Sequence, residues 1–168
     1  RLRRRLNWET LKLFRPDDQD VLAARMNFSD DDAQPPDLDE VIRRIDRFSR
    51  AWRGTWISRR PPVLILNPQS KRTPMLWCCN NQNEFESVAR GVSPDRPVLI
   101  IRSTHNVLAS HALRPRYCKD LVMAYREAIT QGLGAFPDAI GGSCGGHAII
   151  EEFARQIIAE GAPPPRVF

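Results

Sequence analysis

The chain has 168 residues, of which 42% are hydrophobic and 27% are charged, with a formal net charge of +5. These fractions are ordinary for a folded chain and the length is that of one average domain, which excludes extensive disorder. The positive charge permits anionic partners but does not require them. No stretch reaches the roughly 18 apolar residues of a membrane span, and no apolar segment follows the arginine-rich start as in a secretory signal. We therefore expect a cytoplasmic protein without a membrane-spanning segment. The chain lacks an initiator methionine, so we also expect it to be part of a longer polypeptide.

Residues 1–60 are predicted to form a helical N-terminal segment or adaptor. Apolar residues at helical spacing predict short helices within 6–28, and the acidic, proline-containing stretch 30–37 is typical of a linker. Residues 38–52 are predicted to form one amphipathic helix, packed against either Val21–Phe28 or the region that follows. Its buried face consists of Val41, Ile42, Ile45 and Phe48. The segment fits an adaptor, the tail of a helical repeat or part of a neighbouring carrier domain.

From residue 61 to residue 168 the pattern changes to alternating strands and helices, which predicts an α/β fold with a mostly parallel sheet. The predicted strands are Val63–Leu66, Leu76–Cys79, Val98–Ile101 and Ala139–Ile140, and a further apolar segment begins at Val167. The predicted helices lie around 85–92, 117–130 and 147–160, with a long loop at 103–115.

The cysteines show no spacing that indicates a disulfide framework or a zinc site. None of the four, Cys78, Cys79, Cys118 and Cys144, forms a C-x-x-C pair. We therefore expect buried thiols and no metal.

A glycine-rich turn between the last predicted strand and helix carries the main chemical signal. Residues 141–145 match G-x-S-x-G, the pattern of a nucleophile elbow, in the strand–turn–helix context that the elbow requires. The turn is so tight that its central residue, Ser143, is expected to have a strained backbone, and side chains two positions away would collide. Gly141, Gly145 and Gly146 are therefore the expected elbow glycines.

In this interpretation Ser143 is the nucleophile, and backbone N–H groups stabilise the oxyanion. One donor is expected from Cys144, the residue after the nucleophile, and the second from the loop 80–83, at Asn81 or Gln82. The alternative is a glycine-rich or anion-binding turn without catalysis. A phosphate loop would need a lysine, and a dinucleotide site would need G-x-G-x-x-G, and neither is present here.

With these motifs in place, residues 74–168 resemble the N-terminal half of the α/β-hydrolase thioesterase domains of nonribosomal peptide and polyketide synthases. The matching segments are Pro74–Cys79, Phe85–Ala89, Asp95–Ser103, Tyr117–Ile129, Ile140–Gly146 and Glu151–Gly161. The resemblance implies a partial α/β-hydrolase fold and a serine acyl hydrolase that releases acyl or peptidyl groups from a thioester. The substrate would be carried on the phosphopantetheine of a carrier protein or on coenzyme A, and no cofactor of the enzyme itself is implied.

The chain departs from the family at several positions. The stretch 80–83 contains no glycine where the family has a glycine-containing oxyanion turn. The acid and the histidine of the triad are expected after residue 168, since none of the three histidines is in the family's position. His147 is expected to pack against or cap the elbow helix, and His105 and His111 are expected to be solvated loop residues.

Two other functions remain open at this point. The chain can instead be a non-catalytic α/β module that binds an acyl carrier or another partner protein, because a fold alone does not decide function. Nucleic-acid binding would have to use the arginine clusters at 1–5, 43–44 and 59–60. These clusters lack the aromatic residues that alternate with basic ones in nucleic-acid recognition modules. We therefore expect the arginines to lie on solvated helix faces.

Overall fold

The structure is a computed structural model of the chain and describes residues 35–108, 114–134 and 136–168, with Arg114 as backbone only. The helices predicted within 6–28 lie outside these residues. The described helices are α3 (Leu38–Phe48), α4 (Gln82–Gly91), α5 (Arg114–Leu133) and α6 (His147–Ala159), and the 3-10 turn η2 (Cys144–Gly146) precedes α6. The strands are β1 (Thr55–Arg59), β2 (Pro62–Leu66), β3 (Met75–Cys79), β4 (Val98–Arg102), β5 (Ala139–Gly142) and β6 (Arg166–Val167).

The strands form one mixed sheet of six strands in the order β1-β2-β4-β3-β5-β6. The pairings of β3 with β4, β3 with β5 and β5 with β6 are parallel, whereas β2 is antiparallel to both of its neighbours. Parallel neighbours need a crossover connection, which α4, α5 and α6 supply for the later strands. The predicted α/β class with a mostly parallel sheet is confirmed.

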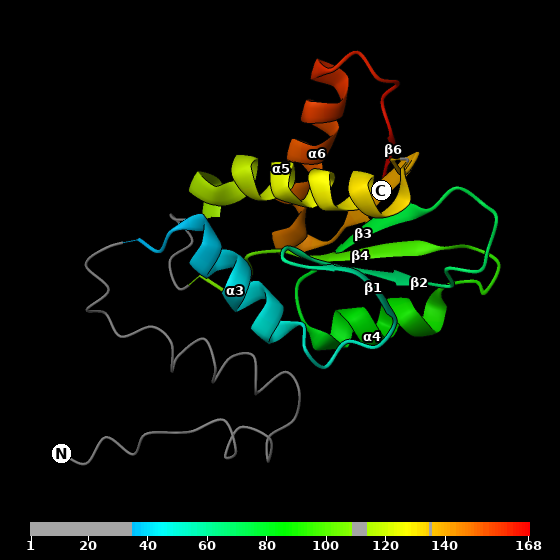
Figure 1. The fold of residues 1–168 in the computed structure, drawn as a ribbon, viewed down its shortest axis with the longest axis horizontal. Helices are drawn as coiled ribbons and strands as arrows, with labels where there is room; N and C mark the ends of the chain where they lie inside the picture. Colours follow the sequence, from blue (N-terminus) through cyan, green and yellow to red (C-terminus); the bar gives the residue numbers. More distant parts are fainter. Residues whose placement is uncertain (1–34, 109–113, 135) are drawn as a thin grey trace.

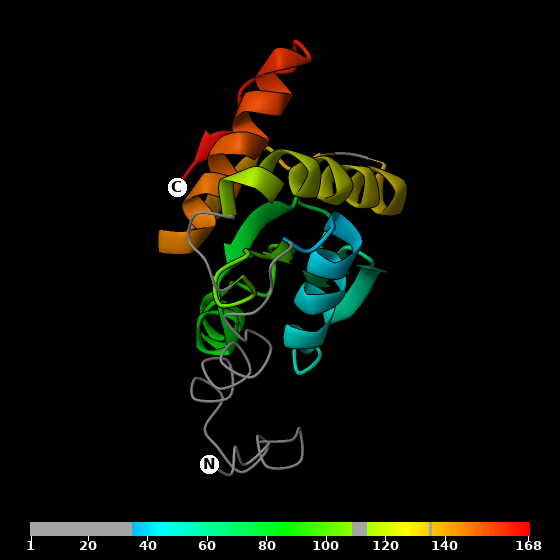
Figure 2. The same cartoon turned by 90° about the vertical axis from the view of Figure 1, so that its left-hand side faces the viewer.

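Helices cover both faces of the sheet (Figure 1). In this view α5 and α6 lie above the strands and α4 lies below them, and the view turned by 90° keeps this separation (Figure 2). Successive residues of a strand point to opposite faces. Leu99 and Ile101 of β4 therefore pack in the core under α3, α5 and α6. Val98 and Ile100 pack in a second core with Phe85 of α4.

The predicted helix over residues 38–52 is present as α3 but ends at Phe48. Its predicted inner face is confirmed, because Val41, Ile42, Ile45 and Phe48 are all buried. The carboxylate of Asp37 caps the helix by accepting from the Glu40 N–H at 2.7 Å. The partner of α3 is the α/β body, since its apolar face joins the core beneath α5.

Strand β1 was not predicted, because no strand was expected before residue 61. It pairs antiparallel with β2, with Thr55 opposite Ile65. Residues 1–60 are therefore not helical throughout. The hairpin also extends the sheet by one strand at its outer edge.

The segment after α3 crosses the carboxyl end of β4. There the fully buried Arg102 donates to the Phe48 carbonyl at 3.4 Å. Its guanidinium lies 5.2 Å from the centre of the Phe48 ring and 5.7 Å from that of Trp52. Trp52 in turn stacks on Phe85 of α4, with ring centres 4.9 Å apart. The Phe48 and Trp52 rings thus cover the Arg102 guanidinium at the carboxyl end of β4.

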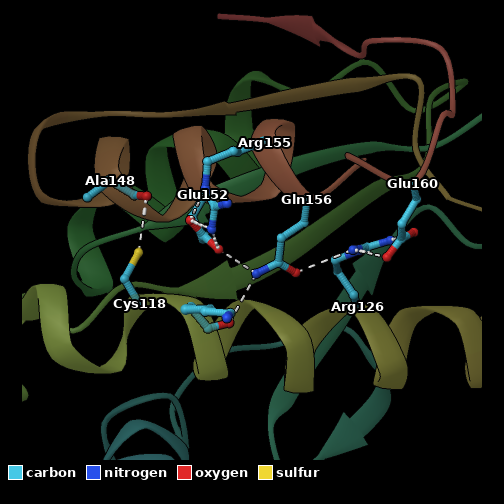
Figure 3. A network of polar contacts seen from close by, with 8 residues as sticks. Cys118, Arg126, Ala148, Glu152, Arg155, Gln156 and Glu160 are labelled. Atoms are coloured by element: carbon cyan, nitrogen blue, oxygen red, sulfur yellow. Dashed lines mark hydrogen bonds and ion pairs between the residues drawn. The ribbon is translucent and has the colours of Figure 1, made fainter. Parts of the chain in front are cut away.

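A polar network joins α5 to α6, the helix that follows the glycine-rich turn (Figure 3). The Gln156 amide donates to the Lys119 carbonyl at 3.1 Å and to Glu152 at 2.6 Å, and it accepts from Arg126 at 3.3 Å. Arg126 also pairs with Glu160 at 2.8 Å. Gln156 is the buried member of this network, so its bonds set the position of α6 against α5.

Candidate functional site

Three polar residues meet at the carboxyl ends of the parallel strands. Asn80, Ser103 and Ser143 are the first residues after β3, β4 and β5 respectively. From β3 the chain crosses to β4 on one side and later returns to β5 on the other side. In an open α/β sheet, such a reversal of strand order creates a crevice in which ligands bind.

Asn80 connects all three strand ends through its side chain. Its Nδ2 donates to the backbone carbonyl of Ser143 at 2.7 Å and to Glu84 Oε2 at 2.9 Å. Its Oδ1 accepts from the Ser103 hydroxyl at 2.7 Å. Asn80 and Ser103 are both buried, so these bonds form in a region with little access to water.

Glu84, in the first turn of α4, is the acidic centre of the cluster. Its carboxylate accepts from the backbone N–H of Asn80 at 2.8 Å and from the Trp77 indole at 3.3 Å, in addition to the Asn80 amide. The fourth donor is the Ser143 hydroxyl, which lies 2.8 Å from Glu84 Oε1. The predicted nucleophile therefore contacts a carboxylate that the sequence analysis did not identify.

The turn between β5 and α6 has the predicted strand–turn–helix form, but its strained residue is not the predicted one. Ser143 has ordinary extended backbone angles, φ −106° and ψ 153°. Cys144 has φ +43°, in the left-handed region that non-glycine residues rarely adopt. The Gly146 N–H closes the turn on the Ser143 carbonyl at 2.8 Å. The expectation of backbone strain at Ser143 was wrong, because the residue that reverses the chain is Cys144.

The three glycines expected to form the elbow lie in crowded positions. A Cβ on Gly141 would lie 2.6 Å from the Trp77 ring, and one on Gly146 would lie 2.9 Å from the Cys78 carbonyl. A Cβ on Gly145 would lie 3.0 Å from both Asn80 and His105. Side chains at these positions would displace the turn from the sheet.

Gly142, which was not named among the elbow glycines, is crowded as well. A Cβ there would lie 3.1 Å from the Cβ of Cys78. The turn is thus held against β3 by glycines on both sides of Cys144.

The two predicted oxyanion donors of the β3–α4 loop lie at the start of α4. Asn81 is the N-cap residue, and its side chain accepts from the Glu84 N–H at 2.9 Å. Gln82 is the first residue of the helix. Their N–H groups belong to the positive end of the helix dipole, near the turn that carries Ser143. Their role as donors, like that of the Cys144 N–H, stays a prediction.

One histidine lies beside the turn. His105 is partly buried, and its imidazole packs against Gly145. Its backbone N–H donates to the Ser103 hydroxyl at 3.1 Å. The expectation of a solvated residue was wrong for His105, because the end of β4 turns it toward the neighbouring strand end. His147 is exposed and pairs with Glu151 at 3.0 Å, so it is a surface residue of α6, and His111 lies outside the described residues.

The thiols of the region differ in exposure. Burial raises the pKa of Cys78 and of Cys79, and the nearby Glu84 carboxylate raises both further. Cys144, in contrast, is exposed, so the expectation of buried thiols was wrong at this position. Buried thiols remain protonated and inert, whereas an exposed thiol is open to reaction.

The comparisons with known proteins return no relative. No protein-family model matches the chain, and neither a curated protein nor a solved structure matches it significantly. Within the described residues, no group of three or more metal-ligating side chains is arranged to hold an ion. In the same part of the chain, no helix combines the length and apolar character needed to cross a membrane.

Proposed function

We propose that this chain carries the nucleophile elbow of an acyl hydrolase that releases acyl or peptidyl groups from a thioester on a carrier protein or coenzyme A. The observation that carries the proposal is the turn at residues 142–146. It follows a buried parallel strand, contains a non-glycine residue with positive φ, and leads into a helix that packs on the sheet. This is the local structure that exposes a nucleophile at the edge of a sheet.

The sheet supports the same proposal. The strand order β1-β2-β4-β3-β5-β6, with β2 as the reversed strand, is the order in which an α/β-hydrolase sheet begins. The elbow follows the fifth strand, and the loop between the third strand and the next helix lies beside it, as the oxyanion hole of these enzymes requires.

The surroundings of the turn suit acyl transfer. The N-terminal end of η2 and α6 follows the end of β5, and the positive end of a helix favours the negative charge that develops when a carbonyl is attacked. Two nucleophilic side chains, Ser143 and Cys144, occupy the turn and both are exposed. The nucleophile would form an acyl-enzyme, which water then hydrolyses.

The test is thioester hydrolysis by the full-length protein, followed by the release of free thiol from acyl-coenzyme A or an acyl-pantetheine. Replacing both Ser143 and Cys144 by alanine removes both candidate nucleophiles, and we expect a loss of at least about a thousandfold in rate. Ser87→Ala, on the exposed side of α4, is the matched control and should retain the full rate. If the double variant hydrolyses thioesters as fast as the parent, the enzyme proposal fails. If the parent is inert but binds an acylated carrier protein, the binding module replaces it.

A further inference from the structure

We infer that Cys144 rather than Ser143 is the nucleophile of this site, with His105 as the base that takes the thiol proton. The inference rests on the proposed function and concerns the same turn. It depends on the bonds of Ser143, the backbone of Cys144 and the position of His105.

The hydroxyl of Ser143 already serves as a structural donor. It donates to Glu84 at 2.8 Å, while its backbone carbonyl accepts from Asn80 at 2.7 Å. Activating this hydroxyl would place an alkoxide within hydrogen-bonding distance of the Glu84 carboxylate. Two negative charges at that distance disfavour each other, and the Asn80 amide, 3.4 Å from the hydroxyl oxygen, is already bonded to the same carboxylate. The contact therefore opposes nucleophilic attack by Ser143.

Cys144 occupies the position that an elbow gives to its nucleophile. It is the first residue inside the turn closed between Ser143 and Gly146, and it carries the positive φ. Gly142 and Gly146 lie two positions before and after it, and a Cβ on them would lie 3.1 Å and 2.9 Å respectively from Cys78 of β3. Residues 142–146 thus form a G-x-C-x-G elbow centred on Cys144, offset by one residue from the G-x-S-x-G pattern.

His105 is placed next to this elbow by the same polar network that holds the strand ends. Its imidazole packs against Gly145, the residue that follows Cys144, at a distance of 3.0 Å between Nδ1 and the Cβ position of that glycine. Its backbone is bonded to Ser103, whose hydroxyl donates to Asn80. A thiol is several orders of magnitude more acidic than a serine hydroxyl, so an imidazole is a sufficient base for Cys144.

The reaction balances with these two groups. His105 accepts the thiol proton while the Cys144 sulfur bonds to the thioester carbonyl carbon. The carbon–sulfur bond to the pantetheine arm then breaks, and the departing thiolate takes the proton from the imidazolium. In the second half, His105 takes a proton from water, whose oxygen attacks the acyl-cysteine. The carbon–sulfur bond to Cys144 breaks, the departing Cys144 thiolate takes the proton back from the His105 imidazolium, and the carboxylic acid leaves.

The experiment uses single variants of the full-length protein in the thioester assay. We expect Cys144→Ala to lower the rate by at least about a thousandfold, as removing a nucleophile does. Ser143→Ala should lower it by less than about tenfold, because only a positioning bond is lost. Cys118→Ala, which removes a thiol from α5, is the cysteine control and should retain the full rate.

A second readout follows the thiol directly. Iodoacetamide should inactivate the parent by alkylating Cys144, and His105→Gln should slow this alkylation at pH 7. Cys144→Ser keeps a nucleophilic oxygen in the elbow, and we expect it to be at least about a hundredfold slower than the parent. If Ser143→Ala is inactive and Cys144→Ala retains the rate, the inference is overturned while the proposed hydrolase stands. If alkylation of Cys144 does not depend on His105 at pH 7, the assignment of the base is wrong.

Discussion

Replacing Asn80 by alanine is the change that should most weaken the junction of β3, β4 and β5. The substitution removes three short hydrogen bonds, to Glu84, to the Ser143 carbonyl and from the Ser103 hydroxyl. A typical bond contributes about 1 kcal/mol to stability and one to a charged group about 1.5 to 3 kcal/mol. The buried Ser103 hydroxyl also loses its acceptor. We expect Asn80→Ala to lower the free energy of unfolding by about 3 to 5 kcal/mol.

The aspartate variant at the same position adds a pH dependence. It replaces a donor by a carboxylate that faces Glu84 and the Ser143 carbonyl. Burial and the neighbouring negative charge raise the pKa of the introduced carboxyl above the value of about 3.9 in the unfolded chain. The folded state then binds the proton more tightly than the unfolded chain does, so this variant is most stable below the unfolded-state pKa of about 3.9. Its stability falls as the pH rises through the raised pKa of the folded state.

Urea unfolding at pH 4 and at pH 7 measures both effects. Asn80→Asp should be the less stable of the two variants at pH 7 and should approach Asn80→Ala at pH 4. Gln131→Ala, which removes an exposed amide bonded to Glu127, is the control and should change the free energy by less than about 0.5 kcal/mol. A loss below about 1 kcal/mol for Asn80→Ala would refute the claim that this amide holds the three strand ends together.

Three further predictions concern α5 and α6. Phe153→Ala leaves a cavity at a fully buried position and should lower the free energy of unfolding by about 3 to 5 kcal/mol, measured in urea. Ile158→Ala, at a position that is 54% exposed, should have little effect, and equal losses would contradict the assigned inner face of α6. Gln156→Leu removes the hydrogen bonds of this amide to the Lys119 carbonyl and the Arg126 guanidinium, and it should lower the free energy of unfolding by about 1 to 3 kcal/mol. An unchanged free energy would show that the network does not set the position of α6. Partial burial raises the pKa of Cys118 to about 11, so alkylation of its thiol should be slow at pH 8 and should accelerate as the pH approaches 11. Peptide mass spectrometry can follow this labelling, and fast labelling at pH 8 would contradict the raised pKa.

The parts of the fold that could be predicted from the sequence are those with a dense apolar pattern. The run at 98–101 is buried on both faces of the sheet, and its four apolar residues in succession indicate such a strand directly. The inner face of α3 follows from helical spacing in the same way. Strand β1 is exposed at both ends and only partly buried in its middle, so it lacks the continuous buried apolar run that marks β4. Its pairing with β2 decides its conformation.

The candidate site could be predicted only in part. The position of the elbow follows from the strand–glycine–helix pattern, but the glycine-rich run fits two patterns, one centred on Ser143 and one on Cys144. Only the backbone angles distinguish them. The contact between Glu84 and Ser143 joins residues 59 positions apart, and no local pattern marks it. The one available signal was that Asn80 and Ser103 each follow a predicted strand, which places them at one edge of a parallel sheet.

The strand order has a consequence for how the chain folds. The β1–β2 hairpin pairs residues that are close in sequence, such as Thr55 and Ile65, and needs only a short loop to close. The contact between Asn80 and Ser143 spans 63 positions and requires α4, β4 and α5 to be in place before β5 inserts beside β3. Pairings of such high sequence separation form slowly, so we expect the strand ends around Asn80 to assemble after the transition state for folding. Substitutions there should accelerate unfolding and leave the folding rate nearly unchanged, whereas substitutions in the hairpin should slow folding itself.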